Sequence, residues 1–370
     1  MAKKIYVIAG EASGDLHGAN LIRALREESS EPLEIYGVGG ERIRETGALN
    51  FVDLAHFHVT GFSEAIRRMP KYWAASKKIL DGVRAARPDT VVLIDNPGFN
   101  LHLAEKIHSL GIPIVYYIAP QVWAWAPKRI LKIKKCVRKV LVVFEFEKKI
   151  YEENGVCVAW VGHPLKDLIG VSEKTIEIME NSPRVLLLPG SRKGELKHLL
   201  ASFLEAAALI KKKLPGTSFD LLKSPSLPQG FYERLLSRAP VPVRLVEDNP
   251  YEVMKTSDLA IACSGTATLE CALLGTPMII ANKGSLLTWA AAKALIRVPY
   301  LGLPNLVLQD GRFPELLQFK MTPRNLAAEA IKIVTDRKIR ERMKEDLREV
   351  SRKLGDPGAG RRAAAEILKI

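Results

Sequence analysis

The hydrophobic pattern of the chain alternates short apolar runs with amphipathic segments of helical spacing. Six apolar runs lie in the first part of the chain: Ile5–Ala9, Leu33–Val38, Val91–Ile94, Ile114–Ile118, Val140–Phe144 and Val158–Val161. Five more follow: Val185–Leu188, Ser218–Leu222, Val243–Val246, Leu259–Ala262 and Met278–Ala281. Because several runs are apolar throughout, they predict parallel strands covered by helices on both faces.

The two series of strands predict an α/β protein with two domains. We expect residues 1–165 to form the first domain, residues 166–345 the second, and residues 346–370 to form helices that pack on the first domain or on a partner. A polar helical pattern over Ser172–Asn181 begins the second domain. Tandem parallel-sheet domains predict a ligand in the cleft between them, at the carboxyl ends of the strands.

A turn of small residues, Ser264-Gly265-Thr266-Ala267, joins the run Leu259–Ala262 to a helical pattern. The first turn of a helix has unpaired N–H groups and the positive end of the helix dipole, so this turn predicts a phosphate site. Glu270 falls one turn into the helix, where it could accept hydrogen bonds from a ribose diol. A structural helix capped by Ser264, with Glu270 facing solvent, explains the same residues equally well.

A second turn of this kind, Gly190-Ser191-Arg192, follows the run Val185–Leu188. An arginine beside a Gly-Ser turn at a helix start is suited to bidentate binding of a diphosphate, whereas the alternative is an ordinary surface arginine.

Two carboxylates in the first domain follow predicted strands. Glu11 lies in the turn Gly10–Asp15, and Asp95 follows Val91–Ile94, where an open α/β sheet places a general base. Helix capping is the structural alternative, by Ser13 or Asp15 in the first turn and by Asn96 in the second. Capping by Asn96 would leave Asp95 available for chemistry.

The loop Ala119–Pro127 holds Gln121 and two tryptophans, Trp123 and Trp125. Tryptophans in a loop bounded by prolines either pack under the loop or line a pocket for a sugar or an acyl group.

The net charge of the chain limits the classes of partner that it could bind. The 370 residues carry a formal net charge of +14, which favours an anionic partner: nucleic acid, anionic lipid or phosphorylated substrates. We find no nucleic-acid-binding module and no histidine spacing typical of a metal site, so we expect neither nucleic acid nor metal.

The four cysteines form no CxxC pair and predict buried thiols in a reducing compartment. Without a signal peptide or a spanning segment, we expect a cytoplasmic protein.

Basic residues beside aromatic ones predict a surface patch. Arginines and lysines at 67, 68, 71, 77 and 78 surround Phe62, Met69, Tyr72 and Trp73, and residues 128–139 form a basic run. Such a patch is typical of a membrane surface or of a nucleic-acid surface. A solvated helix face remains the structural alternative.

Seven motifs occur in an order that resembles the lipid A disaccharide synthase family: Gly10–Asp15, Asp95–Asn100, Gln121–Trp125, Leu188–Arg192, Ser264–Glu270, Leu303–Asn305 and Glu315–Gln318. The resemblance implies a GT-B glycosyltransferase: two Rossmann-like parallel-sheet domains that face a cleft, with C-terminal helices. It implies transfer of 2,3-diacylglucosamine from UDP-2,3-diacylglucosamine to the 6-hydroxyl of 2,3-diacylglucosamine 1-phosphate, without a cofactor, to form a β-1,6-linked disaccharide. The essential aspartate of the family falls on Asp95 and its essential arginine on Arg192.

The resemblance also implies roles for other residues. Asp95 is the expected base, with Glu11 orienting the acceptor or replacing it as base. Ser13, Gln121 and Trp123 are assigned to the acceptor. The donor set contains Gly190, Ser191, Arg192, Ser264, Gly265, Thr266, Ala267, Glu270, Asn305 and Glu315. The patch at Phe62, Met69, Tyr72 and Trp73 would dock on the anionic face of the inner membrane, and a homodimer fits the same picture.

The chain departs from the family at Gly98, where relatives often carry an acid, and at Thr60, where methionine is common. A carboxylate role at position 98 is therefore not carried over. Three alternative functions remain from the sequence: another GT-B transferase acting on a lipid-linked cell-wall sugar, a UDP-sugar epimerase of the same fold, and a nucleic-acid-binding protein, which only the net charge of +14 suggests.

Overall fold

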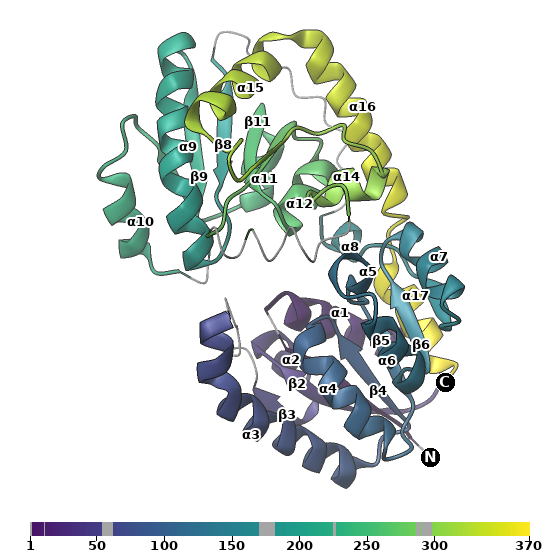
Figure 1. Cartoon of the computed structure of the whole chain (residues 1–370). Coiled ribbons are helices and arrows are strands. Elements are labelled where there is room, and N and C mark those ends of the chain that lie inside the picture. The colour runs from purple at the N-terminus through teal and green to yellow at the C-terminus, as the bar shows by residue number, and fades with distance from the viewer. Residues whose placement is uncertain are drawn as a thin grey trace. The chain divides into compact units, whose positions relative to one another are not determined.

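The computed structural model describes residues 2–10, 12–53, 62–169, 182–224, 227–285, 289 and 298–370. The chain divides into two compact units (Figure 1). Unit 1 contains Met1–Asp167 and Leu354–Ile370, and unit 2 contains Leu168–Lys353. The end of the chain therefore returns to the unit in which the chain begins.

Unit 1 is built on a seven-stranded parallel sheet with the order β3-β2-β1-β4-β5-β6-β7. Its strands are β1 (Lys3–Ala9), β2 (Leu33–Gly39), β3 (Leu49–Asp53), β4 (Thr90–Ile94), β5 (Ile114–Tyr117), β6 (Lys139–Val142) and β7 (Val158–Trp160). Every residue of β4 and β5 is buried, as expected for central parallel strands with helices on both faces.

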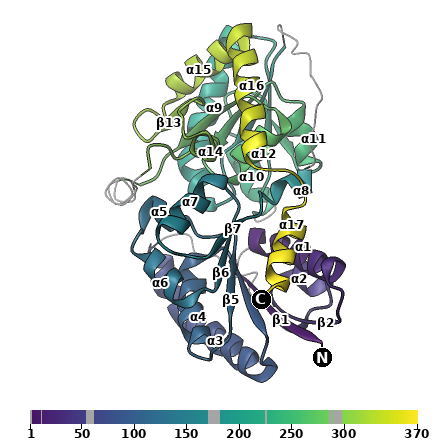
Figure 2. The ribbon, with the colours of Figure 1, turned by 90° about the vertical axis from the view of Figure 1, so that its right-hand side faces the viewer.

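Two groups of helices cover this sheet (Figure 2). On one face, α3 (Phe62–Ala86), α4 (Pro97–His108) and α6 (Arg129–Cys136) contribute to a single apolar core with the strands. On the other face, α1 (Ala12–Glu28) packs against α17 (Ala359–Leu368). The shorter helices are α2 (Glu41–Glu45), α5 (Val122–Trp125) and α7 (Glu145–Glu153), and α8 (Leu165–Ile169) begins in unit 1 and ends in unit 2.

Polar contacts hold α17 on unit 1. Lys3 Nζ donates to the Leu368 carbonyl at 2.7 Å, and Asp167 accepts the backbone N–H of Gly360 at 3.0 Å, at the start of α17. Lys139 forms an ion pair with Glu366. The carboxylate of Asp167 lies where the helix dipole favours negative charge.

Unit 2 has a six-stranded parallel sheet with the order β10-β9-β8-β11-β12-β13. Its strands are β8 (Arg184–Leu188), β9 (Ser218–Leu222), β10 (Arg244–Val246), β11 (Leu259–Cys263), β12 (Met278–Asn282) and β13 (Glu315–Leu317). Helices α9 (Lys193–Lys213) and α15 (Pro323–Thr335) pack together over β11. The remaining helices are α10 (Gln229–Leu236), α11 (Pro250–Lys255), α12 (Thr266–Leu274), α14 (Leu303–Leu308) and α16 (Arg337–Lys353).

The predicted α/β class is confirmed, and all eleven predicted strands occur within two residues of their expected bounds. Strands β3 and β13 were not predicted, and the pattern over Ser172–Asn181 lies outside the described residues. The expected domain boundary after residue 345 falls inside α16, which is continuous and belongs to unit 2, so the division comes after Lys353. Among the described helices, none has the length and apolar composition that a bilayer-spanning segment requires.

The expectation for the cysteines was correct for three residues and wrong for one. Cys136, Cys263 and Cys271 are buried free thiols, whereas Cys157 is free and exposed. Cys157 immediately precedes β7 at the edge of the sheet, where fewer neighbours cover a side chain.

Candidate active site

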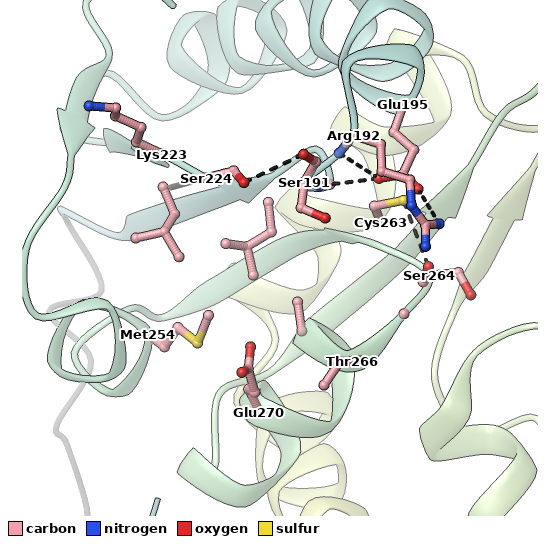
Figure 3. Close-up of a pocket in the computed structure, with 15 residues that line it drawn as sticks. Ser191, Arg192, Glu195, Lys223, Ser224, Met254, Cys263, Ser264, Thr266 and Glu270 are labelled. Carbon is pink, nitrogen blue, oxygen red and sulfur yellow. Dashed lines mark hydrogen bonds and ion pairs between the residues drawn. The ribbon is translucent and has the colours of Figure 1, made fainter. Parts of the chain in front are cut away.

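A cavity of about 440 Å³ lies in unit 2, at the carboxyl ends of β8 and β11 (Figure 3). These strands are neighbours in the sheet, so the loops that follow them lie side by side. Eight of the ten residues in the predicted donor set line this cavity: Gly190, Ser191, Arg192, Ser264, Gly265, Thr266, Ala267 and Glu270. The structure therefore brings the two small-residue turns together in one wall.

The start of α12 presents backbone N–H groups to this cavity. Ser264 does not cap the helix, because its hydroxyl donates to the Leu301 carbonyl at 2.7 Å. No described side chain caps α12 at its N-terminus. Since the structural alternative required a Ser264 cap, this geometry favours the anion site.

The start of α9 is held by a carboxylate. Glu195 Oε2 accepts the backbone N–H groups of Ser191 and Arg192 at 3.1 and 3.2 Å, and Glu195 Oε1 accepts from Arg192 Nη1 at 3.2 Å (Figure 3). Gly190 has φ +99°, and a Cβ there would collide with this carboxylate. Position 190 therefore requires glycine, and Glu195 marks a set of donors that suits an oxyanion. The sequence motif alone did not identify Glu195.

Glu270 projects into the same cavity from the second turn of α12 (Figure 3). Glu270 is partly buried, and Tyr251 donates to its Oε1 at 3.5 Å. Burial raises the pKa of the Glu270 carboxyl. Glu270 therefore does not lie on a solvated face, and its oxygens are placed to accept hydrogen bonds from a ligand.

Asn305 and Glu315, the other two residues of the donor set, do not line the cavity. Asn305 is fully buried, and its amide exchanges hydrogen bonds with the Phe313 backbone and donates to Glu315 Oε1 at 2.8 Å. Glu315 also accepts the N–H groups of Leu301 and Gly302. Asn305 and Glu315 therefore stabilise the loop that contains Leu301. The carbonyl of Leu301 in turn accepts the hydrogen bond from Ser264, so the pair supports the cavity wall indirectly.

The acceptor-side residues lie at the carboxyl ends of three adjacent strands of unit 1. Ser13 follows β1, Asp95 follows β4, and Gln121 and Trp123 follow β5. The order β1-β4-β5 brings these loops to one edge of the sheet. Glu11, the other acidic candidate, lies outside the described residues.

The backbone of Asp95 is fixed in an uncommon conformation. Asp95 and Asn96 have φ values of +49° and +42°, in the left-handed region that residues with a Cβ rarely adopt. The Asp95 carbonyl accepts from Tyr116 Oη at 2.6 Å and from Asn100 Nδ2 at 2.8 Å. Aspartate and asparagine enter this region more readily than other residues with a Cβ, and the two hydrogen bonds to the Asp95 carbonyl hold the conformation.

Asn96 and Asp15 do not take the capping roles weighed from the sequence. No cap hydrogen bond from the Asn96 side chain is found at α4, although Asn96 holds the N-cap position. A Cβ on Gly10 would collide with the Asn96 amide, so Gly10 permits close approach of the first turn. Asp15 is a cap, but of α2: it accepts the N–H groups of Gly40, Arg42 and Ile43. A sequence pattern cannot show that a residue of α1 lies at the start of α2.

Of the predicted surface patch, the structure describes the side chain of Trp73; those of Phe62, Met69 and Tyr72 lie outside the described set. Trp73 is 61% exposed, and Lys106 Nζ lies 5.2 Å from its ring centre. Leu131, which the sequence reasoning missed, is 65% exposed on α6 within the basic run. In the described residues no three His, Cys, Asp or Glu side chains gather as a metal site would require.

Comparisons with known proteins agree with this geometry. Residues 5–367 match the model of a family described as lipid-A-disaccharide synthetase. The lipid-A-disaccharide synthase of Trichlorobacter lovleyi is 37% identical over 375 residues, covering 100% of this chain and 97% of the relative. The predicted family and its glycosyltransferase activity are confirmed, and the alternative functions are not favoured.

Solved structures share the fold at low sequence identity. UDP-GlcNAc 2-epimerase from Neisseria meningitidis, bound to UDP-GlcNAc, is 14% identical with a TM-score of 0.67, covering 99% of this chain and 100% of that chain. The glycotransferase of kitacinnamycin is 17% identical with a TM-score of 0.63, covering 100% and 99%. These likenesses confirm the predicted GT-B fold. With the family match over nearly the whole chain, they lead to one conclusion: this chain belongs to the lipid-A-disaccharide synthase family and is a hexosyltransferase of lipid A disaccharide formation.

Proposed function

We propose that this protein transfers 2,3-diacylglucosamine from UDP-2,3-diacylglucosamine to the 6-hydroxyl of 2,3-diacylglucosamine 1-phosphate, releasing UDP. The observation that carries the proposal is the cavity of unit 2, where the starts of α9 and α12 and the Arg192 side chain converge, with Glu270 one turn further along α12. This arrangement offers donors for a diphosphate and an acceptor for a ribose, which are the two polar parts of a UDP group.

On the donor side, negative charge develops on the β-phosphate as the bond from the sugar to UDP breaks. The N–H groups of residues 265–267 stabilise this charge because the backbone holds them in place before the bond breaks, and Arg192 adds a full positive charge. A diphosphate on the α9 donors replaces the Glu195 carboxylate there. Glu270 accepts hydrogen bonds from the ribose hydroxyls.

On the acceptor side, Asp95 takes the proton of the 6-hydroxyl as its oxygen forms the new bond to the anomeric carbon. A sugar hydroxyl has a pKa far above neutrality, so the reaction needs a positioned base. The clamped backbone of Asp95 supports this role, since it limits where the carboxylate can lie. Ser13, Gln121 and Trp123 contact the acceptor, and Glu11 orients it or acts as the alternate base.

Replacing Asp95 tests the assignment of the base. The Asp95→Asn variant keeps the shape of the side chain but removes its basicity, so we expect turnover to fall by about 10²–10⁴-fold, with the UDP dissociation constant unchanged. The control is Asp89→Asn, which changes an exposed aspartate at the amino end of the same strand and should leave turnover unchanged. A loss of UDP affinity in Asp95→Asn, with turnover retained at saturating UDP-sugar, would argue against the role as base.

We also propose that the protein docks on the anionic surface of the inner membrane, from the cytoplasmic side. Trp73 on α3 and Leu131 on α6 are exposed apolar side chains on helices that flank α4. Lys106 lies at Trp73, and Lys132 and Lys135 lie close to Leu131 in sequence. Apolar side chains among lysines favour an anionic lipid surface. From the sequence we assign Phe62, Met69 and Tyr72 to the same surface; their side chains lie outside the described set.

Vesicle sedimentation tests this docking surface. The double variant Trp73→Ser/Leu131→Ser should bind phosphatidylglycerol vesicles more weakly than the wild type, by about tenfold or more. Both substitutions remove an apolar side chain that would be buried in the lipid. The matched control is Phe319→Ser, which removes a side chain that is 73% exposed in unit 2 and should leave binding unchanged. Equal vesicle binding by the double variant and the control would rule out this surface.

A further inference from the structure

A fully buried carboxylate in unit 1 has no part in the roles assigned so far. Glu147 lies in the first turn of α7 and has 0% exposed surface. Its neighbour Glu145, in the same turn, is exposed. Within the described residues, no ion pair to Glu147 is found. A buried charge without an opposite charge is costly, so its presence here calls for a functional reason.

Two N–H groups hold this carboxylate. Trp123 Nε1 donates to Glu147 Oε1 at 3.1 Å, and the Phe144 backbone N–H donates to Glu147 Oε2 at 3.3 Å. The second bond is an ordinary capping contact at a helix start, which an exposed side chain could also make. The first bond instead links α7 to the loop after β5.

Helix α7 holds the same loop at two further points. Tyr151, one turn after Glu147 and fully buried, donates its hydroxyl hydrogen bond to the Pro120 carbonyl at 2.9 Å. The ring of Phe146 meets the indole of Trp123 edge-on, with centroids 5.1 Å apart. The loop from Pro120 to Trp123 is therefore fixed at both ends by one helix.

The loop leads directly from the strand that supports Asp95. Strand β5 ends with Tyr116 and Tyr117; Tyr116 Oη donates to the Asp95 carbonyl, and the Asp95 N–H donates to the Tyr117 carbonyl at 3.2 Å. Anything that fixes the loop after Tyr117 consequently fixes the position of Trp123 relative to Asp95.

We propose that Glu147 is a positioning residue of the acceptor site: its buried carboxylate orients the Trp123 indole, and Tyr151 anchors the start of the same loop. The inference rests on the proposed function, because it assigns Trp123 to the acceptor. Ionised Glu147 accepts from both Trp123 and Phe144. A protonated Glu147 loses an acceptor site on one oxygen and gains a donor, so it holds the loop less well.

Glu147 can change its charge near neutral pH. Burial raises the pKa of Glu147 to about 7, and the hydrogen bonds that its carboxylate accepts from Trp123 and Phe144 oppose this shift. Two other titratable groups lie near it. Burial raises the pKa of Tyr151, and it lowers the pKa of His163, whose ring lies 5.3 Å from that of Phe144, to about 3. Both therefore stay neutral between pH 6 and 8, where Glu147 titrates.

The indole N–H of Trp123 reports this contact without any substrate. The full chain, with its five tryptophans labelled with ¹⁵N, is recorded by NMR between pH 6 and 9, and Trp123→Phe assigns the resonance. We expect the Trp123 signal to shift with an apparent pKa of about 7, and to become independent of pH in Glu147→Gln. Unchanged Trp73 and Trp160 signals would show that the variant is folded.

Kinetics then test the consequence. Glu147→Gln should raise the acceptor KM about tenfold at pH 8, as expected for the loss of a hydrogen bond to a charged group, with the UDP dissociation constant unchanged. Trp123→Phe should give a similar defect, and the double variant should be no worse than either single variant, because both changes break one contact. The control Glu145→Gln removes an exposed charge from the same turn and should behave as the wild type.

Two results would overturn the inference: a Trp123 signal that is insensitive to Glu147→Gln, or an acceptor KM that this variant leaves unchanged. A wild-type protein that does not use 2,3-diacylglucosamine 1-phosphate at all would instead overturn the proposed function and the acceptor role with it. The hydrogen bond between Glu147 and Trp123 would still be read from the NMR titration, so the two failures are distinguishable.

Discussion

At the residue scale, the donor cavity shows what a sequence motif specifies and what it leaves open. The turns at Gly190–Arg192 and Ser264–Ala267 were predictable because only small residues permit close approach to a helix start. Asn305 was assigned to the donor, but it is buried and satisfied within its own loop. Residue type alone cannot distinguish a buried structural amide from one that lines a cavity. Glu195 was missed because its role depends on how its side chain folds back to the N–H groups of Ser191 and Arg192, which precede α9.

Arg192 should discriminate between ligands with and without a diphosphate. In the Arg192→Ala variant, we expect UDP binding to weaken by about 10–100-fold, as for loss of a charge-assisted hydrogen bond. Uridine binding should not change, because uridine has no phosphate. Both dissociation constants can be measured by calorimetry.

Arg184 provides the matched control for this measurement, since it lies at the amino end of β8, whereas Arg192 follows the carboxyl end of that strand. Its replacement by Ala should leave UDP binding unchanged. If Arg192→Ala weakened uridine and UDP binding equally, a structural defect rather than a lost phosphate contact would explain the result.

At the element scale, the strands that were predicted and the two that were missed differ in composition and length. The predicted strands include the central ones, which are covered on both faces and are therefore apolar throughout. Strands β3 and β13 each lie at an edge of a sheet, as do β7 and β10, which were predicted. The first, Leu49–Asp53, mixes apolar residues with asparagine and aspartate, and the second, Glu315–Leu317, has three residues. Edge strands of this kind lack the apolar run on which the prediction depended.

Ionisation of Glu147, at the start of α7, should lower the free energy of unfolding of the protein as the pH rises. Glu147 has its pKa raised from 4.5 to about 7, so the folded state binds more protons than the unfolded state between these values. The contribution of Glu147 to the free energy of unfolding is therefore most favourable below pH 4.5, and it is lost as the pH rises through 7. The shift corresponds to roughly 3 kcal/mol, at about 1.4 kcal/mol per unit.

Denaturant unfolding at pH 5 and pH 8 measures this effect. The free energy of unfolding of Glu147→Gln, relative to the wild type, should increase between pH 5 and pH 8 by an amount approaching that value, because glutamine carries no charge. For Glu145→Gln the difference from the wild type should not change with pH, since Glu145 is exposed. A difference that is constant for both variants would show that Glu147 does not titrate in this range.

At the scale of the whole molecule, the family could be identified from the sequence because seven motifs keep their order along the chain. The two-unit organisation followed from two series of apolar strands. The division of the C-terminal helices could not be predicted, because α16 and α17 both show amphipathic patterns. What separates them is where each packs: α16 contacts α12 and α14, whereas α17 contacts α1. Those contacts join residues that are far apart in sequence.

Product analysis by mass spectrometry tests the central claim most directly. The purified protein is incubated with UDP-2,3-diacylglucosamine and 2,3-diacylglucosamine 1-phosphate, without added metal, beside the Asp95→Asn variant. The account predicts a tetraacyl disaccharide 1-phosphate and an equal amount of UDP from the wild type, and at least about a hundredfold less of both from the variant over the same initial period. Intact substrates with the wild type, in detergent that keeps the protein folded, would contradict it; so would an isomerised UDP-sugar without transfer, which would indicate an epimerase.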